Sequence, residues 1–168
     1  MNWRFYFIIS ACRQCIHCIY YSKSNMTLNS ESKYLLDTNI FIILVLSQNE
    51  KLSKKQKTIL QGANNTFYLS EASLYEIAIK VRLEKSNFAG INMNVINEQR
   101  QKFNIKLLSS KEEFYFNIPN VPKVFISNAK PHGDPFDLLI ISQALIENIP
   151  VLSTDDFFPS YEDLNVIS

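Results

Sequence analysis

Short apolar runs alternate with helical patterns from residue 33 onward, and this alternation constrains the fold more than any other feature. The apolar runs predict strands at 33–36, 66–69, 105–108 and 149–153, with a final edge strand at 165–167. The patterns between them predict helices at 38–47, 52–60, 71–85, 92–103, 109–116 and 135–147. Strands and helices that alternate in this way form a parallel sheet with helices on both faces. We therefore predict an α/β protein with three layers, α/β/α, around a central, mainly parallel sheet.

Three of the predicted helices have recognisable starts. Ser70 stands where an N-cap side chain accepts a hydrogen bond from the first turn of a helix. Asp134 precedes Pro135, and proline is favoured at the first helical position because it has no N–H to leave without a partner. Ser109 or Ser110 is expected to cap the helix that ends near residue 116.

The composition indicates one globular domain without a disulfide framework. The chain has 168 residues and a net charge of +1, so no overall basic field marks it as a nucleic-acid binder. Its three cysteines all lie in CRQCIHC (12–18), which favours a reducing compartment. These cysteines and His17 are residue types that bind zinc or an iron–sulfur cluster. A structural zinc site usually takes its ligands from two separate segments, however, and the sequence has no second cluster of such residues.

Residues 1–32 are expected to form an N-terminal extension outside the fold, so that the predicted domain spans 33–168. The stretch MNWRFYFIISAC resembles a lipoprotein signal, but its apolar run is short for a signal peptide and far too short to span a membrane. Met26 is an alternative start, from which a brief polar segment leads to the first strand. We expect a cytoplasmic protein without membrane contact.

Carboxylates stand where the predicted strands end. Asp37 follows the first strand in YLLDTN, and Asp155 follows the fourth in VLSTDDFF. Asp137 lies at the start of the helix that leads to the fourth strand, and Glu76 lies in the helix after the second. Ligands of open parallel sheets bind beyond the carboxyl ends of the strands. We therefore expect four separate segments to bring carboxylates to one edge of the sheet.

Each of these carboxylates also has a purely structural interpretation. Asp37 and Asp155 can cap the segments that follow them, Asp137 can complement the helix dipole, and Glu76 can be a solvated helix residue. Two helical stripes weigh against this interpretation. Asp137 shares its stripe with Ile140, Ile141 and Ala144, and Glu76 shares its stripe with Ile79 and Leu83.

A cluster of carboxylates in a partly apolar cleft is unfavourable unless a cation joins it. Like charges and burial both raise carboxyl pKa values. Mg²⁺ and Mn²⁺ take oxygen ligands and are the cations that such a cluster suits. Sites of this kind hydrolyse phosphodiesters, because the cation activates a water and neutralises charge on the phosphate.

From residue 33 to 168 the sequence resembles PIN domains of the VapC type, the toxins of bacterial toxin–antitoxin pairs. The resemblance rests on YLLDTNIF, YLSEASLYEIAIKVRLEK, HGDPFDLLIISQALIENIPVLSTDDFF and the closing strand. It implies a PIN-like α/β/α fold and a Mg²⁺-dependent ribonuclease, with Mn²⁺ as the alternative ion, that cleaves RNA and is inhibited by a cognate antitoxin. It also implies that the catalytic and metal-binding residues are Asp37, Glu76, Asp137 and Asp155, with Asp37 and Asp137 as the principal ligands.

The resemblance also assigns supporting roles. Thr38 and Asn39 match the residues beside the first aspartate of the family, where they would orient it. Asp134 is an auxiliary acidic residue, although its N-cap position already explains it.

The sequence departs from the family beside the third acidic residue. Many relatives have basic residues where this chain has Gly133 and Leu138, so the contacts to phosphate and the choice of substrate are open. His132 is expected to pack in its loop and not to contact RNA.

Other activities fit the sequence less well. A haloacid-dehalogenase phosphatase needs D-x-D after the first strand, but Asn39 stands at the second position. A phosphorelay receiver needs a phospho-acceptor aspartate after the third strand, where this chain has Leu107, Leu108 and Ser109. The remaining alternatives are a PIN nuclease for RNA processing without an antitoxin, and a PIN-fold binding module with weak catalysis.

Partners are expected from both the residues and the resemblance. Ile79 and Leu83 are apolar residues beside Glu76, and either another chain or the protein's own core covers them. The resemblance implies a homodimer and an antitoxin whose tail fills the active-site groove.

Overall fold

A five-stranded parallel sheet forms the centre of the fold in the computed structural model, which describes residues 31–88, 90–126 and 130–168. The strands lie in the order β3-β2-β1-β6-β7, and every neighbouring pair is parallel. They are β1 (Ser32–Leu36), β2 (Asn65–Ser70), β3 (Lys106–Leu108), β6 (Val151–Leu152) and β7 (Val166–Ile167). The predicted strands and the parallel sheet are confirmed.

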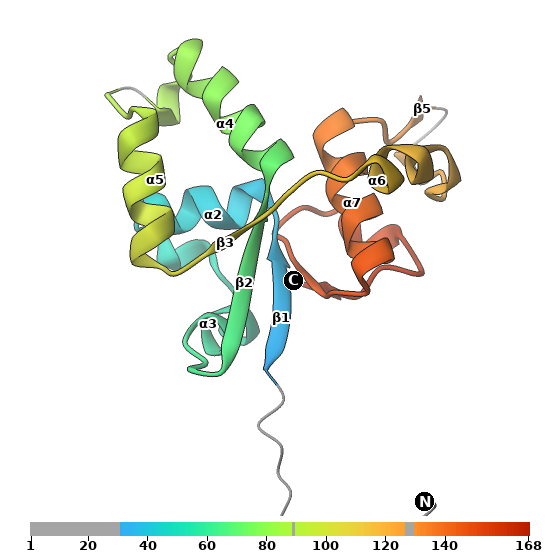
Figure 1. Cartoon of the computed structure of the whole chain (residues 1–168), viewed down its shortest axis with the longest axis horizontal. Helices are drawn as coiled ribbons and strands as arrows, with labels where there is room; N and C mark the ends of the chain where they lie inside the picture. The colour runs from blue at the N-terminus through green and yellow to red at the C-terminus, as the bar shows by residue number, and fades with distance from the viewer. Residues whose placement is uncertain (1–30, 89, 127–129) are drawn as a thin grey trace, which may run out of the picture. The chain divides into compact units, whose positions relative to one another are not determined.

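Helices cover both faces of this sheet, as the predicted three-layer α/β/α fold requires. Figure 1 shows α2, α4 and α5 on one side of the strands and α6 and α7 on the other. The helices are α2 (Thr38–Val45), α3 (Lys54–Leu60), α4 (Glu71–Arg82), α5 (Met93–Lys102), α6 (Glu112–Asn117) and α7 (Pro135–Glu147). Short 3₁₀ turns lie at Asn49–Lys51, Ser86–Phe88, Ile118–Asn120 and Phe158–Ser160.

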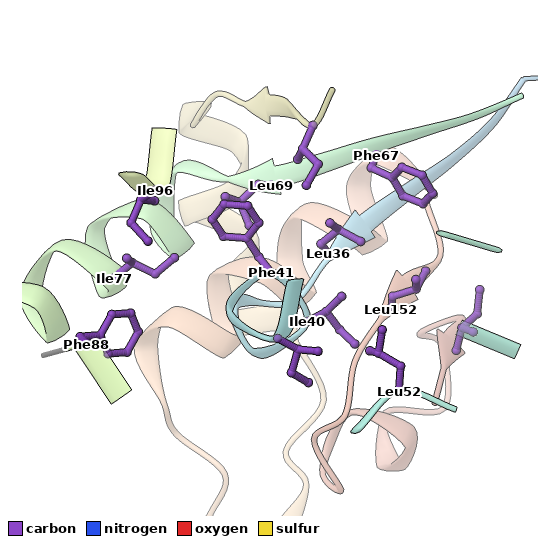
Figure 2. Close-up of a cluster of buried hydrophobic side chains, with 13 residues drawn as sticks. Leu36, Ile40, Phe41, Leu52, Phe67, Leu69, Ile77, Phe88, Ile96 and Leu152 are labelled. Atoms are coloured by element: carbon purple, nitrogen blue, oxygen red, sulfur yellow. The ribbon is translucent and has the colours of Figure 1, made fainter. Parts of the chain in front are cut away.

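Two hydrophobic cores lie on opposite faces of the sheet, because successive strand residues point to opposite sides. Leu35 is in register with Val151, and both belong to the core beneath α7. Leu36 is in register with Leu152, and both belong to the core beneath α2 and α4. Figure 2 shows the second of these cores, in which Phe41 of α2 packs among the strand residues.

Two of the predicted helix caps are confirmed. Ser70 Oγ accepts a hydrogen bond from Ala72 N, and Asp134 Oδ1 accepts hydrogen bonds from Phe136 N and Asp137 N.

The predicted cap of α6 is wrong. This helix has Lys111 at its N-cap position, without a capping hydrogen bond from that side chain. Ser110 precedes the N-cap, and its backbone N donates to the Glu71 carboxylate at 2.8 Å.

Helices α2 and α4 end earlier than predicted. Ser47 (φ 56°) and Glu84 (φ 48°) adopt left-handed backbone conformations two residues after the last helical residue. A left-handed residue at this position is a common way to end a helix, and glycine usually supplies it. Serine and glutamate give no such signal in the sequence.

The proline-containing loop before α7 holds an antiparallel pair that was not predicted. It consists of β4 (Phe125–Ile126) and β5 (Lys130–Pro131). Strands of two residues are too short to show an alternating pattern.

The expectations for the N-terminal extension, the Met26 start and CRQCIHC fall on residues 1–30, which are outside the described residues. Within the described ranges, no helix combines the length and apolarity that crossing a bilayer requires.

Candidate active site

Asp37 lies at the carboxyl end of β1, in the middle of the sheet. Its backbone N donates to Leu152 O at 3.0 Å, and its Oδ2 accepts a hydrogen bond from Ser153 Oγ at 2.9 Å. The residue is only 2% exposed. It occupies the N-cap position of α2, but its side chain accepts no capping hydrogen bond in this described helix. Capping therefore does not explain the buried carboxylate.

Burial is the main reason that the pKa of Asp37 rises from 3.8 to about 6. The negative charges of Asp155 and Glu76 raise this pKa further, and the hydrogen bond from Ser153 opposes the rise. Asp37 is therefore within electrostatic reach of two other predicted site residues.

Ser153 joins the ends of β1 and β6. While its hydroxyl donates to Asp37, the same oxygen accepts a hydrogen bond from Asp155 N at 3.0 Å. Asp155 Oδ1 in turn accepts from Phe157 N at 2.7 Å, which fixes the turn after β6. Ser153 is fully buried, and the sequence reasoning did not identify it. A hydroxyl directly after the apolar run of a strand was the available signal.

Asp137 lies in the first turn of α7, where Asp134 caps the helix. Its Oδ2 is 3.1 Å from Nε2 of His132, a buried residue as expected for a packed loop histidine. Burial is again the main reason that the pKa of Asp137 rises from 3.8 to about 8. The charges of Asp134, Asp37, Asp155 and Glu76 add to this rise.

Glu76 projects from α4 and forms an ion pair with Lys80 at 2.6 Å. Its side chain is 18% exposed, so it is neither fully solvated nor part of the core. Its charge contributes to the raised pKa values of both Asp37 and Asp137. The four predicted carboxylates therefore share one electrostatic environment.

Of the three auxiliary residues, two have definite contacts. Thr38 is buried and its Oγ1 donates to Ser73 Oγ at 3.0 Å, which joins α2 to α4. Asp134 caps α7, and Asn39 is exposed.

The donor chemistry of this cluster fits a hard divalent cation, because all four side chains offer carboxylate oxygens and two of them have raised pKa values. The side chains are not assembled into a finished ligand set, since no three His, Cys, Asp or Glu residues of the described ranges are arranged to hold one ion. Repulsion between carboxylates and the ion pair of Glu76 with Lys80 both favour such a spread arrangement.

Two hollows lie on the surface near the elements that carry these carboxylates, and Asp155 lines the first of them. One of about 330 Å³ is lined by Lys51, Ser153, Thr154 and Asp155 together with neighbouring polar residues, and therefore has one cationic side chain beside the acidic cluster. Another of about 570 Å³ is mainly apolar. Its lining includes Tyr75, Tyr115, Phe136 and Leu139.

Comparisons with known proteins identify the fold. A chain in the crystal structure of VapBC2 from Rickettsia felis, bound to a DNA fragment from their promoter, has a TM-score of 0.57 at 18% sequence identity, and the match covers 80% of this chain and 97% of that one. A chain of VapBC-1 from nontypeable Haemophilus influenzae has a TM-score of 0.57 at 19% identity, and the match covers 81% of this chain and 97% of that one. No curated protein matches the sequence.

The sequence model of the family described as PIN domain matches residues 34–164. This match includes Asp37, Glu76, Asp137 and Asp155 together with the strands and helices that carry them. The chain belongs to the PIN domain family.

Proposed function

We propose that this protein is a metal-dependent endoribonuclease that hydrolyses RNA phosphodiester bonds and acts as the toxin of a toxin–antitoxin pair. Membership of the PIN domain family supports a nuclease. The observation that carries the proposal is the buried Asp37 at the end of β1, within electrostatic reach of Glu76, Asp137 and Asp155. Keeping carboxylates together without a cation costs stability, so their arrangement is best explained by a cation that they bind.

In this proposal Asp37 and Asp137 are the principal ligands of Mg²⁺ or Mn²⁺. Asp155 and Glu76 complete the acidic cluster, directly or through water. When bound, the cation supplies positive charge to the scissile phosphate and lowers the pKa of the attacking water. Ser153 holds one oxygen of Asp37 and the backbone of Asp155, so the two carboxylates keep a fixed relationship while substrate binds. Lys51 supplies a positive charge at the adjoining hollow, where it can contact an RNA phosphate.

The proposed partners are a cognate antitoxin and a second copy of the chain, in the cytoplasm. The two solved structures named above are of VapBC proteins, which supports an antitoxin. Tyr75 and Ile79 of α4 and the C-cap residue Leu83 form an exposed stripe, the α4 stripe, and are 65%, 37% and 60% exposed. Among the described residues, the hydrophobic cores do not cover this stripe, and we propose that a partner chain does.

The test is cleavage of single-stranded RNA by the purified chain with Mg²⁺ or Mn²⁺. Cleavage is expected to fall to background with Asp37→Asn or with a chelator. Asp163→Asn removes an exposed carboxylate outside the cluster and is expected to keep full activity. Cleavage that survives both Asp37→Asn and chelation would contradict the proposed metal-dependent mechanism. RNA binding without cleavage would favour the binding module, and an active nuclease without an antitoxin gene beside its own would favour RNA processing.

A further inference from the structure

A buried histidine connects Asp137 to the C-terminal part of the chain. His132 Nε2 lies 3.1 Å from Asp137 Oδ2, and His132 Nδ1 lies 2.8 Å from the hydroxyl of Tyr161. His132 is 9% exposed and Tyr161 is 2% exposed. Both nitrogens of the ring thus have partners, one from the first turn of α7 and one from the segment after β6.

Packing fixes the orientation of this imidazole ring. It stacks on Phe157 with ring centroids 5.2 Å apart and an angle of 22° between the planes. The Tyr161 ring meets it edge-on at 6.0 Å. The backbone N of His132 donates to Val124 O at 2.7 Å. The ring cannot turn away from Asp137 without losing the stacking, the hydrogen bonds or both.

The hydrogen bonds have a defined direction when Asp137 is ionised. A carboxylate only accepts, so His132 Nε2 carries the hydrogen and donates it. In the neutral ring, Nδ1 is then the acceptor, and the Tyr161 hydroxyl donates to it. The Tyr161 hydroxyl therefore favours the tautomer that donates to Asp137.

We propose that His132 and Tyr161 are positioning residues: His132 holds Oδ2 of Asp137 by a hydrogen bond and leaves Oδ1 to bind the divalent cation, and Tyr161 orients His132. This inference rests on the proposed function. Hydrogen-bond partners of metal ligands orient the ligand, and their loss typically lowers metal affinity by about 10- to 100-fold. Ser153 does the same for Asp37, since it holds Oδ2 and leaves Oδ1 outside that bond.

The first experiment measures Mn²⁺ binding to the full chain by titration calorimetry. Tyr161→Phe removes only the hydroxyl, and His132→Phe keeps the stacking on Phe157 but removes both ring nitrogens. Each variant is expected to bind Mn²⁺ about tenfold more weakly than the unaltered chain. The double variant is expected to bind no more weakly than His132→Phe, because Tyr161 acts through His132.

His132→Gln and Tyr34→Phe serve as matched variants. Glutamine returns an N–H donor near Asp137 and is expected to recover part of the affinity. Tyr34→Phe removes a hydroxyl in β1 and is expected to leave affinity unchanged. Circular dichroism checks that each variant folds.

A second experiment reads the tautomer directly, by nitrogen-15 NMR of the imidazole. The chain has only two histidines, so His17→Gln leaves the signal of His132 alone. The spectra are recorded with saturating Mg²⁺, which keeps Asp137 ionised, and under this condition the proposal expects a hydrogen on Nε2, with partial loss of that form in Tyr161→Phe. A hydrogen on Nδ1 alone would overturn the proposal, as would unchanged Mn²⁺ affinity in folded His132→Phe. Absence of Mn²⁺ binding by the unaltered chain would overturn the proposed function as well. This outcome therefore distinguishes a failure of the proposed function from a failure of the positioning roles alone.

Discussion

Ser153 Oγ donates a hydrogen bond to Asp37 Oδ2 at 2.9 Å, although the two residues are 116 positions apart in the sequence. The bond connects the carboxyl ends of two neighbouring strands, β1 and β6. It also places a buried hydroxyl between Asp37 and the backbone of Asp155. The arrangement of the acidic cluster therefore depends on a residue that carries no charge.

Ser153→Ala is expected to destabilise the protein by about 1–3 kcal/mol, because it removes a buried hydroxyl that makes two hydrogen bonds. It is also expected to raise the pKa of Asp37 further, since the Ser153 hydrogen bond lowers that pKa. Urea denaturation measures the stability, and RNA cleavage is expected to fall by at least about tenfold. Ser160→Ala, at an exposed site, is the control. Equal effects of the two substitutions would contradict this role of Ser153.

Asp37→Asn is expected to stabilise the protein at pH 8 in the presence of a chelator, while it abolishes RNA cleavage. Burial of the ionised Asp37 costs free energy, which its raised pKa of about 6 reflects. A neutral amide avoids that cost, and one pKa unit corresponds to about 1.4 kcal/mol. We expect a gain on the order of 3 kcal/mol in the free energy of unfolding. A loss of stability at this pH would show that burial of the ionised Asp37 does not destabilise the folded protein.

In the presence of a chelator, which keeps the protein free of metal, the free energy of unfolding is expected to fall as the pH rises from 5 to 9. The folded-state pKa values of Asp37 (about 6) and Asp137 (about 8) lie above the ordinary value of 3.8. The folded state therefore binds more protons than the unfolded state in this window. Their contribution to stability is complete below about pH 3.8 and is lost as the pH passes the folded-state values.

Saturating Mg²⁺ is expected to reduce this decline, because a cation favours the ionised carboxylates. Urea denaturation at several pH values, with and without Mg²⁺, measures both effects. Stability that rises with pH in the chelator would contradict the assignment.

Gln56→Ala is expected to cost about 2–4 kcal/mol of stability. Gln56 is 1% exposed, and its Nε2 donates to Ser153 O at 2.9 Å and to Ile167 O at 3.0 Å. It therefore ties α3 to the ends of β6 and β7. Gln61→Ala alters an exposed glutamine next to the same helix and is expected to change stability by less than about 0.5 kcal/mol. Thermal and urea denaturation compare the two, and similar losses would refute the role of Gln56.

Leu83→Glu is expected to weaken association with a second copy or with the antitoxin, and to leave RNA cleavage by the chain alone intact. The side chain is 60% exposed on the α4 stripe, so a charge there does not disturb the core. Light scattering measures self-association, and calorimetry measures antitoxin binding. Lys85→Glu places the same charge at an exposed position beyond α4 and is the control. Unchanged association in Leu83→Glu would exclude this stripe as the interface.

The sequence predicted the fold where several local signals agreed. Apolar runs fixed the main strands, and Ser70 and Asp134 fixed two helix starts. It did not predict the early end of α4, because Glu84 takes a left-handed conformation that glycine usually marks. Nor did it predict β4 and β5, whose two residues each are too few to form a pattern.

The sequence by itself determined which carboxylates stand at the strand ends, because the carboxyl ends of parallel strands all lie at the same edge of the sheet. Asp37 and Asp155 follow from this polarity alone. The tertiary structure decided what holds the carboxylates, since Ser153, His132 and Tyr161 meet them only when distant segments pack together. Hydrogen bonds between distant segments depend on side-chain positions to within a few tenths of an ångström, and periodicity carries no such information.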